Sequence, residues 1–577
     1  MKKNLLFVFA IACMINAPAQ WVGGGTQISS SADEHHRAFV SSAGNGAYYI
    51  TWNATDTTAA GLGKIMLSAY DGTGTLRSGW TAGGNLISQT GDHYAPQLIT
   101  SEDGGAIVSW YGYAGASSIS HIYVQKYSSA GVALWNSGNP VQVSTGTIYN
   151  HKYPIITSDK NNGVYITWTR YDNANSASSP DIFLQHIDLN GNVASGWNAS
   201  ATSVAANANV RECESQLALT PDLSSVYVVY ASGLIGNTSL ILKKYDSSNG
   251  NSSSGWSVNG VTISSGPNVY PEINHDLFLF ADNSNDADVF WLESRSSANG
   301  ELYVQQVNPS GSILLSANGI QLAGNTANGI DYLEISQESD YDFLIAYNNL
   351  ETFNDVATMK VRPNGSVIWH DVANTTGGYS AYPMPVSDGN KGMFVFYKKT
   401  GSQDKLYGFE LDSTGTITSN FALPGSGFGN VNNYDGFDPN YDLNPVATNA
   451  GEAVVSWNRK TSNNLYSIFT CNLLSDGSTC TTNTMGIEEN NLSATVFSVY
   501  PNPFENQITL SLNNGNSIPA GEMTLKIFDI TGKTIQESKM NSTDKTVLST
   551  EKWADGMYFY QVLSNDEIIQ SGKIIRE

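Results

Sequence analysis

Trp21-Val22-Gly23-Gly24-Gly25-Thr26-Gln27-Ile28-Ser29 matches Trp80-Thr81-Ala82-Gly83-Gly84-Asn85-Leu86-Ile87-Ser88 almost position for position. Three strand-like segments precede the second stretch, whereas none precedes the first. The last repeat of the chain has the complementary defect, because it reaches Leu473-Leu-Ser-Asp-Gly477 and has no fourth strand of its own. We therefore predict that Trp21–Ser29 pairs into the last repeat and joins the two ends of the repeat array, which removes two exposed sheet edges.

The repeat is defined by a strand that ends in an aromatic residue, as in Val164-Tyr-Ile-Thr-Trp168. Successive copies of this aromatic are separated by 58, 58, 62, 61, 56, 50 and 60 residues, and the eight copies are Trp52, Trp110, Trp168, Tyr230, Trp291, Tyr347, Tyr397 and Trp457. Each unit reads as four short strands joined by Gly-, Asn- and Asp-rich turns, which is the pattern of a β-propeller blade. The prediction is an all-β chain with an eight-bladed propeller closed by the N-terminal strand. The alternatives are seven blades, since the sixth and seventh copies are the least regular, and an open solenoid.

The domain boundaries are predicted from the N-terminal residues and from changes in composition along the chain. Lys2-Lys3, the apolar stretch Leu5 to Ala12 and Ala17-Pro18-Ala19 predict a signal peptide at residues 1–19. The propeller is predicted at 20–480, a polar linker at 481–493 and a small β-sandwich at 494–577. No other stretch is apolar enough to predict a transmembrane segment. The net charge of −23 argues against nucleic-acid binding, because the surface would repel phosphates.

Cys471 and Cys480 flank the turn signal Ser475-Asp476-Gly477. Their side chains could face each other across a hairpin, so a disulfide is predicted, which suits an oxidising compartment. Two free thiols are the alternative.

Nothing in the sequence forms a known catalytic motif. One group of aromatic and imidazole side chains recurs just before the first strand of several blades: His93, Tyr94, His151, Tyr153, Tyr270 and Tyr382. Such groups around a central depression could bind a sugar or a peptide. The alternative is that they only pack between blades. His35-His36 is expected to lie in a solvated turn.

One insertion contains candidate metal ligands. Asp435, Asp438 and Asp442 lie in an insertion rich in oxygen ligands and could hold Ca²⁺. Asp and Asn also favour turns for backbone reasons, and no other cofactor is predicted. Asp282, Asp286 and Asp288 form a similar cluster.

The C-terminal region carries several motifs in a fixed order. These are Tyr500-Pro-Asn-Pro-Phe504, Phe528-Asp-Ile-Thr-Gly-Lys533, Asp555-Gly-Met-Tyr-Phe559 and Gly572-Lys-Ile-Ile575. Together they closely resemble the type A C-terminal sorting domain of the type IX secretion system of Bacteroidetes. The resemblance implies export across the outer membrane, by way of the periplasm, to the cell surface or the medium, with the type IX machinery as partner. The sorting residues that it carries over are Pro501, Asn502, Pro503, Gly532, Lys533, Gly556, Gly572 and Lys573. The chain departs from the family by ending in Glu577 rather than a basic residue.

These observations favour a secreted propeller that binds an extracellular glycan or protein, and they favour binding over catalysis. The alternatives are an extracellular polysaccharide hydrolase or lyase, and a structural or adhesive surface component. The sequence identifies neither the ligand nor the oligomeric state.

Overall fold

In the computed structural model the chain forms two compact units, residues 1–482 and 483–577. The structure describes residues 21–576 apart from 22–24, 30–32, 45, 58–61, 89–90, 115–118, 173–179, 208–209, 235–236, 267–276, 295–299, 325–328, 351–354, 374–378, 401–404, 422–424, 431–442, 462–464, 481–496, 513–522, 530–532, 541–544 and 565–566. The predicted signal peptide and linker thus lie outside the described residues. The all-β prediction is confirmed: apart from the short 3-10 turn η1 (Asn136–Gly138), every regular element described is a β-strand. No helix in this part of the chain has the length and hydropathy that a bilayer crossing requires.

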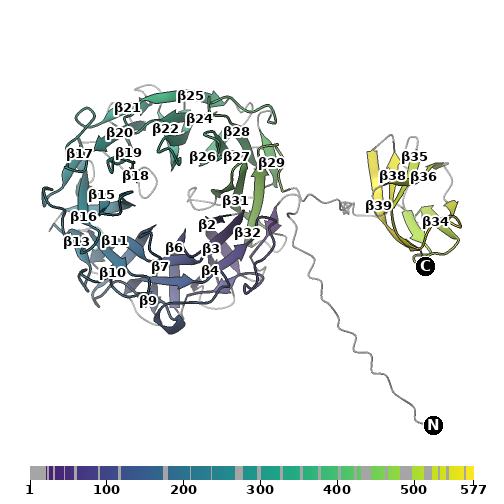
Figure 1. Ribbon diagram of the computed structural model, residues 1–577, viewed down its shortest axis with the longest axis horizontal. Helices are drawn as coiled ribbons and strands as arrows, with labels where there is room; N and C mark the ends of the chain where they lie inside the picture. Colours follow the sequence, from purple (N-terminus) through teal and green to yellow (C-terminus); the bar gives the residue numbers. More distant parts are fainter. Residues whose placement is uncertain are drawn as a thin grey trace, which may run out of the picture. The chain divides into compact units, whose positions relative to one another are not determined.

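Within its described residues the first unit contains eight four-stranded antiparallel sheets, which Figure 1 shows following one another around a circle. We number them in chain order. Sheet 1 contains β2 (Glu34–Gly44), β3 (Ala47–Thr55), β4 (Gly63–Tyr70) and β5 (Asn85–Leu86); sheet 2 contains β6 (Gly91–Thr100), β7 (Ala106–Ala114), β8 (Ser120–Tyr127) and β9 (Val141–Gln142). Sheet 3 contains β10 (Tyr149–Ser158), β11 (Val164–Asp172), β12 (Asp181–Ile187) and β13 (Thr202–Ala205); sheet 4 contains β14 (Arg211–Leu219), β15 (Ser225–Leu234), β16 (Asn237–Asp246) and β17 (Val261–Gly266).

The other four sheets follow the same order. Sheet 5 contains β18 (Leu277–Ala281), β19 (Ala287–Glu293), β20 (Glu301–Val307) and β21 (Ile320–Ala323); sheet 6 contains β22 (Ile330–Gln337), β23 (Phe343–Asn349), β24 (Asp355–Val361) and β25 (Val367–Ala373). Sheet 7 contains β26 (Tyr379–Ser387), β27 (Met393–Thr400), β28 (Lys405–Leu411) and β29 (Ser426–Asn430). Sheet 8 contains β30 (Leu443–Asn449), β31 (Glu452–Lys460), β32 (Tyr466–Leu474) and, as its fourth strand, β1 (Thr26–Gln27).

Strand β1 is the only member of its sheet that is distant in sequence. Thr26 lies opposite Thr470 and Gln27 opposite Phe469, in antiparallel register. The amide of Ile28 extends the ladder by donating to the Ile468 carbonyl at 2.9 Å. The beginning of the described chain is therefore hydrogen-bonded into the last sheet of the first unit.

A glycine before the fourth strand explains why residues 21–29 match residues 80–88. Gly25, at φ +93°, lies so close to the Trp457 indole that a Cβ would approach it to 2.4 Å. Gly84, at φ +89°, has the same relation to Trp52, where a Cβ would lie 2.5 Å from the ring. Only glycine tolerates both the left-handed backbone and this contact. The shared spacing thus fits the fourth strand over the repeat-defining tryptophan in sheets 8 and 1.

In sheets 1 to 4 a second tryptophan of the repeat links the sheet to the next one. The indole N–H of Trp80 in sheet 1 donates to the Ser129 carbonyl in sheet 2 at 3.0 Å. Sheets 2, 3 and 4 repeat the contact through the pairs Trp135 and Leu189, Trp197 and Ser247, and Trp256 and Pro309, at 2.8–3.0 Å.

Trp21 occupies the equivalent position in sheet 8 and contacts sheet 1. Its side chain is only 4% exposed and stacks on Tyr48, with ring centroids 6.0 Å apart. The turn glycine Gly74 leaves space for the indole, since a Cβ there would lie 2.9 Å from it. Sheets 8 and 1 are thus packed together through the same tryptophan position as sheets 1 and 2.

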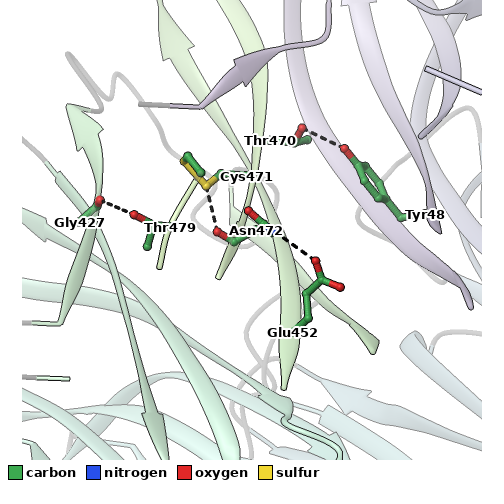
Figure 2. The surroundings of a disulfide bond; sticks show 8 residues. Tyr48, Gly427, Glu452, Thr470, Cys471, Asn472 and Thr479 are labelled. Carbon is green, nitrogen blue, oxygen red and sulfur yellow. Dashed lines mark hydrogen bonds between the residues drawn. A yellow bond between two sulfur atoms is a disulfide. The ribbon is translucent and has the colours of Figure 1, made fainter. Parts of the chain in front are cut away.

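A disulfide lies close to this junction. Cys471 and Cys480, the predicted pair, are bonded with an S–S distance of 2.07 Å, while Cys213 is buried and free. Figure 2 shows the neighbouring contacts: the Tyr48 hydroxyl of sheet 1 lies 3.2 Å from the Thr470 hydroxyl, and Thr479 donates to the Gly427 carbonyl of sheet 7 at 3.4 Å. The end of sheet 8 therefore contacts both of its neighbours.

The second unit has two antiparallel sheets around one core. One sheet has the order β33 (Phe497–Tyr500), β34 (Gln507–Leu512), β37 (Lys545–Ser549), and the other has the order β36 (Thr534–Met540), β35 (Met523–Asp529), β38 (Gly556–Ser564), β39 (Glu567–Arg576). The apolar side chains of Ile508, Leu525, Val562 and Ile574 are fully buried in the shared core. Alternating apolar and polar residues along these short strands produce this arrangement.

Replacing Trp21 with alanine tests the contact between sheets 8 and 1. Loss of a buried tryptophan should lower the free energy of unfolding by about 3–5 kcal/mol. Urea denaturation of the mature chain measures this change. Val258, which is 77% exposed, provides the control, because V258A should change stability by less than about 0.5 kcal/mol. If W21A were no more destabilising than V258A, the contact would have no role in holding the two sheets together.

Candidate ligand-binding site

The innermost strands of six sheets share a β-bulge at the same register position. The first bulged residue has a left-handed backbone in each case, with φ between +49° and +58°, and these residues are Arg37, Ala95, Tyr153, Glu214, Tyr332 and Tyr382. A non-glycine residue in this conformation costs on the order of 1–2 kcal/mol. Bulges redirect the side chains around them and are enriched next to functional sites. The repeated bulge therefore marks one end of the inner strands as the place to search for a site.

Asparagine side chains from the preceding sheet hold two of these bulges. Asn53 of sheet 1 accepts from the Ala95 amide at 3.2 Å and donates to the His93 carbonyl at 2.9 Å. Asn348 of sheet 6 accepts from the Tyr382 amide at 3.1 Å and donates to the Ser380 carbonyl. Both asparagines directly follow the aromatic of their repeat. In each pair the aromatic packs in the core of its own sheet, and the asparagine binds the backbone of the next sheet.

The predicted ligand residues His93 and His151 lie inside the sheets. The indole N–H of Trp110 donates to Nδ1 of His93 at 3.2 Å, and that of Trp168 donates to Nδ1 of His151 at 2.9 Å. Burial, helped by the nearby His121 and Arg170, lowers the pKa of His151 to about 4, so it is a neutral acceptor at physiological pH. These contacts agree with a packing role.

His35 in sheet 1 makes the same contact with Trp52, at 3.0 Å. The expectation of a solvated turn at His35-His36 is wrong for His35, because its side chain is 1% exposed and lies within β2. Each of the three histidines precedes its tryptophan by 17 residues, and this recurring spacing was the sequence signal for the pair.

Tyrosines from sheets 2 and 3 form a continuous row. The ring of Tyr111 lies 5.6 Å from that of Tyr94 and 5.7 Å from that of Tyr153, and Tyr153 lies 6.2 Å from Tyr171. Tyr94 donates to the Asp92 carboxylate at 2.6 Å. Burial raises the pKa of Tyr111 and Tyr171 well above the ordinary value, so the phenols stay neutral. The row presents aromatic faces together with hydroxyl groups, which suits a ligand of mixed polarity.

Of the remaining predicted residues, Tyr382 lies in a different aromatic contact. Its ring centroid is 4.3 Å from that of Tyr332, the bulge residue of the neighbouring sheet. Tyr270 lies outside the described residues. The predicted group is therefore divided between the row, the Tyr332–Tyr382 pair and the buried histidines.

A cavity of about 310 Å³ is lined by the inner strands of sheets 1, 2, 3, 6, 7 and 8. Tyr153 belongs both to this lining and to the tyrosine row, so the row leads to the cavity. The lining residues are Phe39, Ala95, Gln97, Tyr153, Pro154, Ile155, Glu334, Ile335, Ser336, Met384, Pro385, Val386, Asn444 and Pro445.

The lining is mostly apolar and carries a single carboxylate, that of Glu334. A glycosidase would need a second carboxylate opposite the first. Sequence reasoning missed Glu334 and Ser336, although both lie just beyond the bulge of β22, at Tyr332. The bulge position could have located them, but only once the register of the inner strands was known.

The predicted calcium ligands Asp435, Asp438 and Asp442 lie outside the described residues. Among the residues that the structure does describe, no group of three His, Cys, Asp or Glu side chains is placed to hold a metal ion. That statement includes the cluster of Asp282, Asp286 and Asp288.

The acidic cluster of sheet 5 differs from the equivalent position in sheet 6. In sheet 6, Lys360 lies opposite Leu344 and its ammonium contacts the Glu338 carboxylate at 2.6 Å. In sheet 5, Gln306 replaces the lysine and Asp288 replaces the leucine. Asp288 is fully buried, and its carboxyl oxygens have no hydrogen-bond partner among the described residues. Burial, together with the neighbouring Asp282 and Asp286, raises its pKa well above the ordinary value.

The sorting motifs at the two ends of the second unit contact each other. The side chain of Asn502 accepts from the Ile575 amide at 2.8 Å and donates to the Lys573 carbonyl at 3.2 Å. The Phe504 amide donates to the Ile575 carbonyl at 2.8 Å. Pro501 and Pro503 flank Asn502 and are exposed. The Pro-Asn-Pro-Phe segment thus binds along the edge of the terminal strand.

Three further sorting residues have described positions. The ring of Tyr560 crosses Gly572, where a Cβ would lie 2.7 Å from it. Gly556 has φ +146° at the start of β38. Lys533 is exposed, and its amide donates to the Asp529 carboxylate at 3.1 Å. The contact with the Tyr560 ring explains why position 572 must be glycine. Gly532 lies outside the described residues.

Comparison with known proteins identifies the second unit. Residues 498–577 match the family model described as a secretion system C-terminal sorting domain. This confirms the resemblance that the motifs indicated. The chain therefore carries a type IX C-terminal sorting domain behind a propeller-like repeat region, and the domain indicates secretion through that system. No curated protein matches the sequence.

Solved structures resemble the chain only weakly. Puromycin hydrolase is 14% identical, with a TM-score of 0.40 over 76% of this chain and 62% of its own, so the chain spans about three fifths of that protein. A protein of unknown function from Dyadobacter fermentans is 9% identical, with a TM-score of 0.33 over 78% and 98%. The α-L-arabinanase of Penicillium chrysogenum is 12% identical, with a TM-score of 0.35 over 59% and 98%. At these TM-scores we draw nothing about activity.

Substitution of Asp288 by asparagine should stabilise the protein at neutral and alkaline pH. The unfolded chain releases the Asp288 proton near the ordinary pKa of 3.8, whereas the folded chain retains it to higher pH. The native protein therefore loses stability relative to D288N as the pH rises from 3.8 through the folded pKa. We expect a gain of about 1–3 kcal/mol at pH 8 and a smaller gain at pH 4.

Urea denaturation at the two pH values measures the difference. The exposed turn residue Asp340 supplies the control, because D340N makes the same acid-to-amide change without touching the cluster. A D288N gain that is the same at both pH values would contradict the assignment of a buried, protonated carboxyl group.

Proposed function

We propose that this chain is a secreted protein whose first unit is a closed eight-bladed β-propeller that binds an extracellular ligand, a glycan or a protein, at the cell surface. The signal peptide at residues 1–19 starts export, and the C-terminal sorting domain carries the protein across the outer membrane. The bacterium that makes it belongs to the Bacteroidetes, the phylum whose sorting domains the C-terminal motifs resemble.

Two observations support closure of the ring. The first is the hydrogen bonding of β1 to β32, which gives sheet 8 the same number of strands as the other seven. The second is the packing of sheet 8 on sheet 1, where the Val40 amide donates to the Asn444 side chain at 2.9 Å and Trp21 stacks on Tyr48. A closed ring places the inner strands of all sheets around one axis, which is where propellers bind ligands.

The tyrosine row that ends in the cavity is the observation that carries the binding function. Tyr153 has its ring in van der Waals range of Tyr111 and Tyr171 and also lines the cavity. The bulge that presents it has a strained backbone, and strain that recurs across the sheets supports a site at this end of the strands. Tyrosine side chains give both stacking area and hydrogen bonds to a ligand.

The double variant with Tyr94 and Tyr153 changed to alanine tests binding at this site. It should lose retention on an extracellular glycan or matrix-protein array, because it removes two of the four rings in the row. Tyr407 serves as a matched control, since it is also half-buried and stacked, on Tyr397 in sheet 7, but does not line the cavity. Equal retention by the double variant and by Y407A would refute the site. Loss of folding, seen as a large fall in Tm, would instead show that the row only packs the sheets.

Delivery is tested by deletion of residues 499–577. The truncated protein should accumulate in the periplasm, because the sorting domain is the part that indicates type IX secretion. Cell fractionation and protease treatment of intact cells measure the location, with the full-length chain in the same strain as the reference. A truncated protein that still reaches the surface would disprove the delivery route.

A further inference from the structure

The innermost strands of the eight described sheets each place one residue at the same register position. In every sheet this residue pairs with the one that precedes the repeat aromatic, as Phe39 pairs with Thr51 and Gln97 with Ser109. In sheet order the eight residues are Phe39, Gln97, Ile155, Gln216, Phe278, Glu334, Met384 and Asn444. The odd-numbered sheets thus supply apolar side chains at this position, and the even-numbered sheets supply polar ones.

Six of these positions line the cavity, namely those of sheets 1, 2, 3, 6, 7 and 8. Sheet 1 is hydrogen-bonded to sheet 8 through the Val40 amide and Asn444 at 2.9 Å, and to sheet 2 through a pair of hydroxyl groups 2.8 Å apart. Sheet 1 therefore lies between sheets 8 and 2. Within the lining, the aromatic side chain of Phe39 is flanked by the side-chain amides of Asn444 and Gln97.

Both amides have hydrogen-bonding groups that a ligand can reach. The Gln97 side chain is partly exposed, and neither its oxygen nor its nitrogen has a hydrogen-bond partner among the described residues. The Asn444 oxygen accepts from the Val40 amide, which orients the side chain, whereas its NH2 group donates to no described residue. Asn444 is also partly exposed. The two amides therefore offer donors to the cavity and, at Gln97, an acceptor.

The rest of the lining limits the class of ligand. Among the described lining residues there is no Lys, Arg or His, so an anionic ligand would find no counter-charge. Glu334 already has an interaction partner and is not needed for binding. Three prolines of the inner strands also line the cavity: Pro154, Pro385 and Pro445. Proline has no N–H group, so these positions offer no main-chain donor to an extended peptide.

We propose that the cavity binds one residue of a neutral glycan, with the sugar ring against Phe39 and its hydroxyl groups bonded to the Gln97 and Asn444 amides. This inference rests on the proposed binding function and narrows the ligand from a glycan or a protein to a glycan. At about 310 Å³ the cavity lies at the small end of the usual range of about 300–1,000 Å³, so it accommodates a single sugar residue.

A sugar ring matches the alternation of polar and apolar positions. Its faces carry C–H groups that can lie on an aromatic side chain, and its edge carries hydroxyl groups that both donate and accept. A purely apolar ligand would remove water from the Gln97 and Asn444 amides without replacing the lost hydrogen bonds, which costs free energy. The lining therefore favours a ligand that has hydroxyl groups next to a hydrocarbon face.

Saturation-transfer NMR on the full mature chain tests the proposal with neutral sugars as probes. The probes are the methyl glycosides of glucose, galactose, mannose, xylose and arabinose, and at least one of them should bind. Glucuronate and N-acetyl-trialanine amide represent an anionic sugar and a peptide, and both should bind about tenfold more weakly than the tightest glycoside. Failure of every glycoside to bind would overturn the proposal, and so would tighter binding of glucuronate or of the peptide.

The Q97L variant tests the role of the amide. It should lose about tenfold in affinity for the bound glycoside, because it removes a donor and an acceptor at similar side-chain size. An unchanged Tm shows that the variant is folded. If its Tm falls, the titration of the wild type with the glycosides decides the question.

Q216L is the matched control. Gln216 has the same register position in sheet 4 and likewise has no hydrogen-bond partner among the described residues, but it does not line the cavity. Its loss should leave glycoside binding unchanged. If a folded Q97L bound the glycoside as tightly as the wild type does, or if Q216L weakened it equally, the assignment of Gln97 would be overturned.

The outcome also separates this inference from the proposed function. If the array of the Tyr94/Tyr153 test retains the protein but no glycoside binds, this inference fails and the proposed function stands. If nothing is retained and no glycoside binds, both fail.

Discussion

The pairing of the short strand β1 with β32 is the interaction on which the first unit depends. Strand β1 consists of two residues, yet it completes sheet 8. The residues paired between β1 and β32 lie more than 440 positions apart in the chain. Its neighbour Trp21 covers the turn of sheet 1 at Gly74. Without this segment β32 would be an unprotected edge strand, and the inner strands of sheets 8 and 1 would lose part of the packing that holds the cavity lining together.

Much of this architecture could be predicted because the same local requirement recurs in the sequence. The aromatic at the end of each second strand fills the core of its sheet, and Trp52, Trp110, Trp168 and Trp291 are all fully buried. The residue before the fourth strand is glycine at Gly25 and Gly84, where the tryptophan ring beneath it leaves no room for a Cβ. These contacts are made within one sheet, so the residues that make them recur in the sequence with a period of about sixty residues.

The site was only partly predictable, because it depends on contacts between sheets. His93 and His151 recur next to tyrosines, as ligand residues would, but their rings accept hydrogen bonds from tryptophans inside the sheet. The β-bulge cannot be recognised from residue type, because Arg, Ala, Tyr and Glu all occupy its first position. Glu334 has no counterpart of the same charge at the equivalent position in sheets 1, 2, 3 and 7, where Phe39, Gln97, Ile155 and Met384 stand. A residue that is present in only one of the repeats cannot be found by searching for a recurring pattern.

The position of β1 also has a consequence for biogenesis. Strand β1 is synthesised some 440 residues before its partner β32. Contacts this distant in sequence form slowly, because the loop between them must first be closed. Strand β1 therefore remains unpaired until β32 has been made, and sheet 8 becomes complete only after nearly the whole first unit has been synthesised.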